Sequence, residues 1–158
     1  MKYIRLTKEQ LEELHEEFAR FLATQSITAD EWEQLKKDKP QVAEEELDVF
    51  SDLVWEGVLN NAEYLEKIDS ASLYLFKIAD DEMKLIAIKV NDPSIDITTD
   101  KGFEWLLKNY LDDSVDFFEA AQPYSEDKNA DIFNLVKMGS VISNGEWYRY
   151  FYELLYAE

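Results

Sequence analysis

The sequence predicts an α+β fold with helices at the N-terminus, a small central antiparallel sheet of three or four strands, and helices at the C-terminus. Apolar residues follow helical spacing up to about Ser70, change to nearly continuous β-branched runs, and return to helical spacing near Lys101. The composition is 46% hydrophobic with only four Gly and three Pro, which is typical of a compact globular protein. No linker or repeat interrupts the chain, so we expect one domain over residues 1–158.

Two amphipathic helices are predicted at the N-terminus. "LTKEQLEELHEEFARFLATQ" begins with a capping box, Thr7 with Gln10, and then repeats apolar residues at helical spacing. "SITADEWEQLKKDKP" repeats this pattern with Thr28 and Glu31, and gives a shorter helix that Pro40 stops or restarts.

The longest helical pattern runs from Pro40 to Asn61. Its apolar positions predict one side facing the interior and its acidic positions predict another side facing water. The interior positions are Val42, Leu47, Phe50, Val54 and Val58, and the positions facing water are Glu45, Asp48, Asp52 and Glu56.

A hairpin is predicted in the middle of the chain. "SLYLFKIA" and "MKLIAIKV" are apolar, β-branched runs joined by the short acidic turn "DDE". The second run is nearly continuous in apolar residues, so we place it in the interior of the sheet. "EYLEKI", just before the hairpin, fits either an edge strand or an extension of the preceding helix.

Three further elements are predicted before the last helix. A helix spans about Lys101 to Leu111, and "SVDFFEAA" reads as another strand. "YSEDKNADIFNLVKMGS" predicts a helix that is capped near Ser125 and ended by Gly139.

The last helix, in "SNGEWYRYFYELLYAE", is predicted to start at a capping box formed by Ser143 and Glu146. Only a narrow stripe of its circumference is non-aromatic, so most of it needs cover. Two interpretations stay open: burial within this domain, or an intermolecular face, including a homodimer through this helix. The aromatic residues are Trp147, Tyr148, Tyr150, Phe151, Tyr152 and Tyr156.

The net charge of the chain indicates which partners are favoured. Sixteen Lys and Arg against 35 Asp and Glu give 16 − 35 = −19. Such a surface repels nucleic acid and anionic lipid, because binding to phosphate needs Lys and Arg. The segments from Pro40 to Glu66 and from Asn109 to Asp127 contain acids and no Lys or Arg. We therefore expect another protein as the partner, in particular a basic one.

Residue types that carry catalysis are scarce. The chain has no Cys, and His15 is its one histidine. The residues that usually form thiolate nucleophiles, catalytic triads and zinc sites are therefore absent or too few. Glu12 and His15 spell one Glu-x-x-His motif, whereas di-iron carboxylate sites need two. The four glycines match no phosphate-binding loop. We expect no catalytic residue, no cofactor and no metal site.

Neither export nor membrane spanning is supported by the sequence. "MKYIRLTKEQ" has no apolar signal region, and no run of about 18 apolar residues occurs. The cytoplasm is therefore the expected location.

Two segments carry a resemblance to a known family. "FLATQSITADEWE" and "ELDVFSDLVWEGVL" carry most of it, with weaker support from "LIAIKVNDPSIDITTDKGFEWL" and "YSEDKN". The chain resembles an uncharacterised family of small acidic cytoplasmic proteins from Bacteroidota, a domain of unknown function. The resemblance implies a bacterial, cytoplasmic origin, and it assigns no activity, cofactor or functional residue.

The leading hypothesis is a non-catalytic cytoplasmic protein-interaction module with a strongly acidic surface. One alternative is an inhibitor or immunity-type protein that mimics a polyanion and blocks a nucleic-acid enzyme. Another is a carboxylate-dependent enzyme that binds a small molecule or a metal. The candidate protein-binding residues are Glu45, Asp48, Asp52, Glu56, Trp147, Tyr148 and Tyr152.

Overall fold

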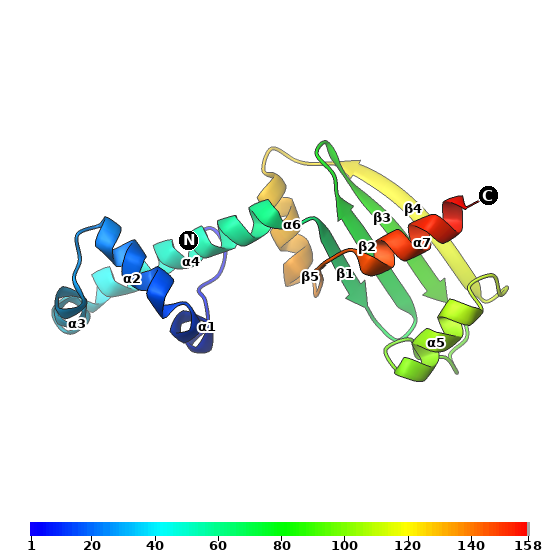
Figure 1. Cartoon of the computed structure of the whole chain (residues 1–158), viewed down its shortest axis with the longest axis horizontal. Helices are drawn as coiled ribbons and strands as arrows, with labels where there is room; N and C mark the ends of the chain where they lie inside the picture. The colour runs from blue at the N-terminus through cyan, green and yellow to red at the C-terminus, as the bar shows by residue number, and fades with distance from the viewer. Residues whose placement is uncertain (158) are drawn as a thin grey trace. The chain divides into compact units, whose positions relative to one another are not determined.

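The computed structural model describes residues 1–157 and confirms the α+β class (Figure 1). The chain divides into two compact units, residues 1–60 and the residues from 61 onward, called here the N-terminal unit and the C-terminal unit. The single domain over residues 1–158 stays a prediction. The sheet has five strands in place of the three or four predicted.

The N-terminal unit is helical, and its predicted caps are confirmed. Thr7 Oγ1 accepts a hydrogen bond from the Gln10 amide at 3.2 Å, and Thr28 Oγ1 accepts one from the Glu31 amide at 3.2 Å. The first predicted helix is divided in two at Leu14. The helices are α1 (Lys8–Glu13), α2 (His15–Thr24), α3 (Ala29–Asp38) and α4 (Pro40–Asn61).

Aromatic rings form the core of the N-terminal unit. The ring centroid of Phe18 lies 5.0 Å from that of Phe50 and 5.1 Å from that of Trp32. The prediction that Val42 and Val58 face the interior is wrong, since both are exposed. The buried side of α4 includes Ala43 and Ser51, small residues that a search for bulky apolar side chains passes over.

The C-terminal unit contains one antiparallel sheet in the order β4-β3-β2-β1-β5. The predicted hairpin forms β2 and β3, and β3 lies inside the sheet as expected. "EYLEKI" becomes β1, which has a neighbour on both sides and is therefore not an edge strand. The strands are β1 (Tyr64–Ile68), β2 (Ser72–Ile78), β3 (Glu82–Val90), β4 (Val115–Pro123) and β5 (Val141–Ser143).

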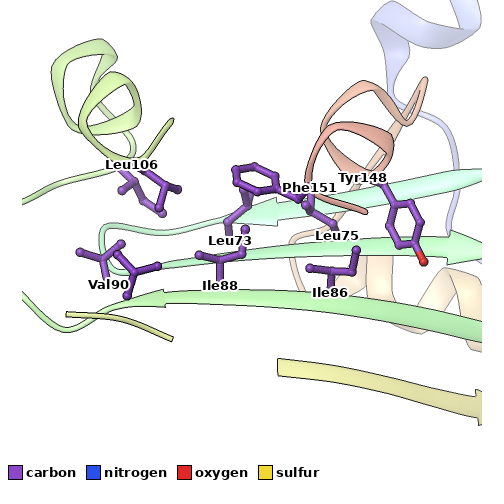
Figure 2. Close-up of a cluster of buried hydrophobic side chains, with 10 residues drawn as sticks. Leu73, Leu75, Ile86, Ile88, Val90, Leu106, Tyr148 and Phe151 are labelled. Atoms are coloured by element: carbon purple, nitrogen blue, oxygen red, sulfur yellow. The ribbon is translucent and has the colours of Figure 1, made fainter. Parts of the chain in front are cut away.

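Helices cover both faces of this sheet. The first face is packed by α5 (Asp100–Lys108) and α7 (Glu146–Tyr156), whose Leu106 and Phe151 are both 0% exposed. Figure 2 shows these two side chains directed toward the inward residues of the hairpin. Side chains alternate between faces along a strand, so Phe76, Leu85 and Ala120 point to the opposite face, where α6 (Lys128–Lys137) lies. The inward hairpin residues are Leu73, Leu75, Ile86, Ile88 and Val90.

The predicted caps of the last two helices are corrected. Asp127, two residues after the predicted Ser125, caps α6 by accepting from the Ala130 amide at 3.1 Å. The N-cap of α7 is Gly145 with φ of 79°, not a Ser143 capping box. Ser143 is used in β5, where it pairs with Tyr64. Three strand residues give too short a pattern to be recognised in the sequence.

We expect Gly102→Ala to destabilise the C-terminal unit. A Cβ at this position of α5 would lie 1.8 Å from the backbone oxygen of Asp96, and a backbone atom cannot move aside as a flexible side chain can. The clash should outweigh the helix propensity of alanine and cost about 1–3 kcal/mol of unfolding free energy in chemical denaturation. Lys101→Ala, at an exposed position of the same helix, is the control and should change stability by less than about 0.5 kcal/mol. Equal effects would contradict the close approach.

Candidate functional site

The acidic side of α4 is contacted by the first residues of the chain. The Asp52 carboxylate accepts hydrogen bonds from the backbone amides of Lys2 at 2.7 Å and Tyr3 at 2.9 Å. The Glu56 carboxylate accepts from the Tyr3 hydroxyl and lies 3.8 Å from Lys2 Nζ. Residues 1–6 are called here the N-terminal segment, and it lies along α4.

Arg5 completes these contacts one turn further along the helix. Its guanidinium donates to Asp48 at 2.7 Å and also pairs with Glu44. The hydrogen bond to Asp48, followed by that to Glu44, raises the pKa of Arg5. Next to it, the backbone amide of Leu6 donates to the buried hydroxyl of Ser51 at 3.0 Å.

Three of the four predicted acidic residues are therefore brought together at helical spacing, and the fourth is not. Asp48, Asp52 and Glu56 share one side of α4 and bond to the N-terminal segment. Glu45 is exposed on the same helix, outside these contacts. A basic partner at this place would compete with Lys2 and Arg5, and binding through these acids stays a prediction.

The aromatic helix α7 is buried on its inner side by its own unit. Phe151 is 0% exposed and Tyr148 is 6% exposed, and Figure 2 shows both rings beside the inward residues of the β2–β3 hairpin. Trp147 is partly buried, with its ring centroid 4.8 Å from that of Phe103 in α5. Of the predicted aromatic binding residues, Trp147 and Tyr148 thus belong largely to the core.

α7 crosses the sheet from β1 to β4 and exposes tyrosines toward its C-terminal end. Tyr148 packs on Tyr64 of β1 with 5.7 Å between ring centroids, and Tyr152 packs on Tyr156 at 4.6 Å. The Tyr156 hydroxyl donates to the Glu119 carboxylate of β4 at 2.6 Å. Tyr152 is 46% exposed and Tyr156 is 54% exposed, so both present rings to solvent beside β4.

β4 forms an open edge of the sheet. Among the described residues it pairs with β3 along one side only, over nine register pairs. Phe118 in its middle is 55% exposed. The sequence predicted a strand here, but strand order depends on contacts between distant segments, so the edge position was missed. This edge with Phe118, Tyr152 and Tyr156 is called here the β4 surface.

A hollow of about 290 Å³ lies next to β4 on the sheet face that carries α6. Its walls are mainly apolar, from Phe76, Met83, Leu85 and Leu135, with Ala120 on the β4 side. Its carboxylate, Asp131, already accepts from the Ser125 amide at 2.8 Å and the Ser125 hydroxyl at 2.7 Å. The hollow suits an apolar side chain better than an acid-base reaction.

Tyr124 also lines this hollow. It donates to the Ala79 carbonyl at 2.6 Å. Burial, and then the nearby charge of Asp80, raises the pKa of Tyr124 to about 12. Tyr124 is therefore a neutral structural donor at physiological pH.

A second hollow, of about 190 Å³, is lined by Glu66, Trp147 and Phe103. Burial raises the pKa of Glu66, and the charge of Glu146 raises it further. A raised pKa suits a general acid, but such chemistry also needs a second reacting group in the same hollow. The other lining residues are Lys67, Ile68, Leu73, Gly139 and Val141.

Among residues 1–157, no three His, Asp or Glu side chains converge in a way that could hold a metal ion. His15 is exposed, with its Nδ1 3.0 Å from the Glu12 carbonyl of the preceding turn. None of the helices described combines the length and apolar character that crossing a bilayer requires.

Comparison with known proteins identifies the family of this chain. The model of a family of unknown function (DUF6495) matches residues 1–156, which is nearly the whole chain. No curated protein and no solved structure matches the sequence.

We expect Asp52→Ala to loosen the N-terminal segment. The substitution removes the acceptor of two backbone amides, so the Tyr3 amide should exchange with solvent at least about tenfold faster, and unfolding free energy should fall by about 1–2 kcal/mol. Hydrogen exchange followed by NMR measures the first effect and chemical denaturation the second. Glu45→Ala is the matched control, and a similar effect from it would show that the contacts do not hold the segment.

We expect Glu66→Gln to stabilise the protein at neutral pH. The folded state holds the proton of Glu66 more tightly than the unfolded chain, so stability falls as the pH rises past about 4.5, and at pH 7 the charged form is a cost. Glutamine removes that cost, which solvent screening keeps to a few tenths of a kcal/mol. Denaturation at pH 7 should show the gain, and the gain should shrink as the pH approaches 4. Glu45→Gln is the control, and a gain that is independent of pH would contradict the explanation.

Proposed function

Because this chain belongs to a family of unknown function (DUF6495), its role has to be inferred from its own surface, and we propose that it is a non-catalytic protein-interaction module. The proposed partner is a basic protein, and the proposed location is the cytoplasm. The proposed binding site is the β4 surface of the C-terminal unit.

The observation that carries this proposal is the exposure of aromatic rings on both faces of one sheet edge, Tyr152 and Tyr156 on the α7 face and Phe118 on the α6 face. Each of the three is about half exposed, although Phe151 on the inner side of α7 is fully buried. Tyrosine and other aromatic residues contribute strongly to protein interfaces, because they bury a large area at a low cost in conformational entropy.

Charge supports a basic partner. The segment from Asn109 to Asp127, which contains β4, carries six acids and no Lys or Arg. Glu119 accepts from the Tyr156 hydroxyl, a neutral donor, whereas Asp116 accepts from the Asn91 side chain at 2.7 Å and lies across from Lys89 of β3. The charge of Glu119 therefore remains effective in attracting a cationic surface.

The alternatives have less support. A polyanion mimic needs one continuous acidic face, whereas the acids of α4 bond to Lys2 and Arg5 of their own chain. A carboxylate-dependent enzyme needs convergent acids, whereas each hollow described above is lined by one carboxyl group.

We expect the double substitution Tyr152→Ser with Tyr156→Ser to abolish partner capture. Affinity capture from a native lysate with chemical crosslinking should recover a protein that the double variant binds at least about tenfold more weakly, because exposed aromatic anchors dominate interface energies. The association rate of that protein should fall steeply with added salt.

Tyr150→Ser is the matched control, since Tyr150 is an exposed tyrosine on the α5 side of α7. It should leave capture unchanged, and melting temperatures should show that both variants fold. If neither the double substitution nor added salt changes the amount of partner captured, the β4 surface is not the binding site. If nothing specific is captured by the wild type, the proposed function is wrong.

A further inference from the structure

We infer that the β4 edge binds its partner by strand addition, so that an extended basic segment of that protein pairs with β4 as a sixth strand. The inference rests on the proposed function and specifies how the β4 surface recognises its partner. Strand addition uses backbone hydrogen bonds for affinity and alternate side chains for specificity.

The register of the sheet shows which backbone groups of β4 point away from it. The Asn91 amide donates to the Ser114 carbonyl at 2.7 Å, which makes these residues a hydrogen-bonded pair of the antiparallel ladder. Such pairs recur at every second residue, so Asp116, Phe118, Ala120 and Gln122 bond to β3. The residues between them turn their N–H and C=O groups outward. They are Phe117, Glu119 and Ala121.

The neighbouring ladder supports this assignment. The Val90 amide donates to the Ala71 carbonyl at 2.7 Å, so the even-numbered residues of β3 bond to β2. The odd-numbered residues of β3 are then the ones that face β4, as the Asn91 bond requires. The outward groups of Phe117, Glu119 and Ala121 follow from two independent hydrogen bonds.

β4 lacks most of the features that protect edge strands from pairing. Natural edges are short, interrupted by bulges, or carry Pro or charged side chains, especially Lys. β4 has nine residues in continuous register with β3, a single Pro123 at its last position, and only acidic charges, Asp116 and Glu119, which repel a like edge and attract a basic strand. The opposite edge, β5, has only three residues. β4 is therefore the edge that can accept a long strand.

Charge decides what kind of strand this edge accepts. A second copy of this chain would bring the same Asp116 and Glu119, and a net charge of −19, against an equally acidic edge. Like charges across a strand pair are destabilising and opposite charges are stabilising. A segment with Lys or Arg across from Glu119 is the occupant that fits, because Asp116 lies on the opposite face of the sheet and already has Lys89 of β3 across from it.

The hollow on the α6 side supplies a place for an apolar residue of the same segment. Ala120 points to that face and is small, so a long side chain across from it can reach over its methyl group to Met83 and Leu85. On the other face, side chains of the added strand would meet Tyr152 and Tyr156. The recognised segment is thus basic on the tyrosine side and apolar at the hollow.

The test uses the full chain and a capped ten-residue peptide of alternating Lys and Val as the probe. We expect saturable binding with a Kd on the order of 0.1 mM at low salt. The amides of Phe117, Glu119 and Ala121, which should exchange fast in the unbound protein, should exchange at least about tenfold more slowly in the complex. The same peptide methylated at every backbone nitrogen keeps its charge but cannot donate hydrogen bonds, and it should give no such protection.

A pair of variants tests the edge from the side of the protein. Ala121→Pro removes one outward N–H without touching the ladder to β3, and should weaken binding of the Lys-Val peptide at least about tenfold. Lys101→Ala, at an exposed position of α5 away from this edge, should bind as the wild type does, and if the proline variant does not fold, the methylated peptide still decides the question.

Three outcomes would overturn strand addition. Equal binding of the methylated peptide would show attraction by charge alone. No binding of the Lys-Val peptide, together with successful partner capture through Tyr152 and Tyr156, would leave the proposed function standing without this mechanism. A dimer in sedimentation that Ala121→Pro dissociates would assign the edge to a second copy of the chain.

Discussion

The packing of Phe151 and Leu106 onto the β2–β3 hairpin is the constraint on which the rest of the C-terminal unit depends. Both side chains are fully buried against the inward residues of the hairpin (Figure 2). Because α7 is held by Phe151 on one side, its tyrosines on the opposite side cannot also be buried by the sheet. The same packing brings Tyr156 to Glu119, so the aromatic surface and the open strand edge occur at one place.

The two acidic segments of the chain use their charge in different ways. On α4 the carboxylates order the N-terminal segment through amide and guanidinium donors, and much of their charge is compensated locally. On β4, Glu119 accepts from the neutral Tyr156 hydroxyl, which leaves its negative charge intact, whereas Asp116 lies across from Lys89 of β3. Net charge alone does not distinguish these cases, since only the contacts show where a field extends into solvent.

Local patterns in the sequence predicted the fold well where the stabilising contacts are local. The capping residues Thr7 and Thr28, the start of α4 at Pro40 and the β2–β3 hairpin are of this kind. The interior side of α4 was predicted partly wrongly, because Ala43 and Ser51 are buried through tight packing, which hydrophobicity does not reveal. β5 was missed because three residues gain strand structure only from pairing with β1.

The candidate site was harder to predict, because it depends on long-range arrangement. The aromatic content of α7 was evident, but which rings face outward depends on the direction in which the helix crosses the sheet. Tyr152 was predicted as a binding residue and is exposed, whereas Trp147 and Tyr148 pack against Phe103 and Tyr64.

The open strand edge at β4 also has a consequence for self-association of the protein. While the molecules repel one another electrically, such an edge is harmless, but near the isoelectric point that repulsion vanishes and neighbouring edges become free to assemble into fibres. The net negative charge of the protein thus opposes self-association through this edge.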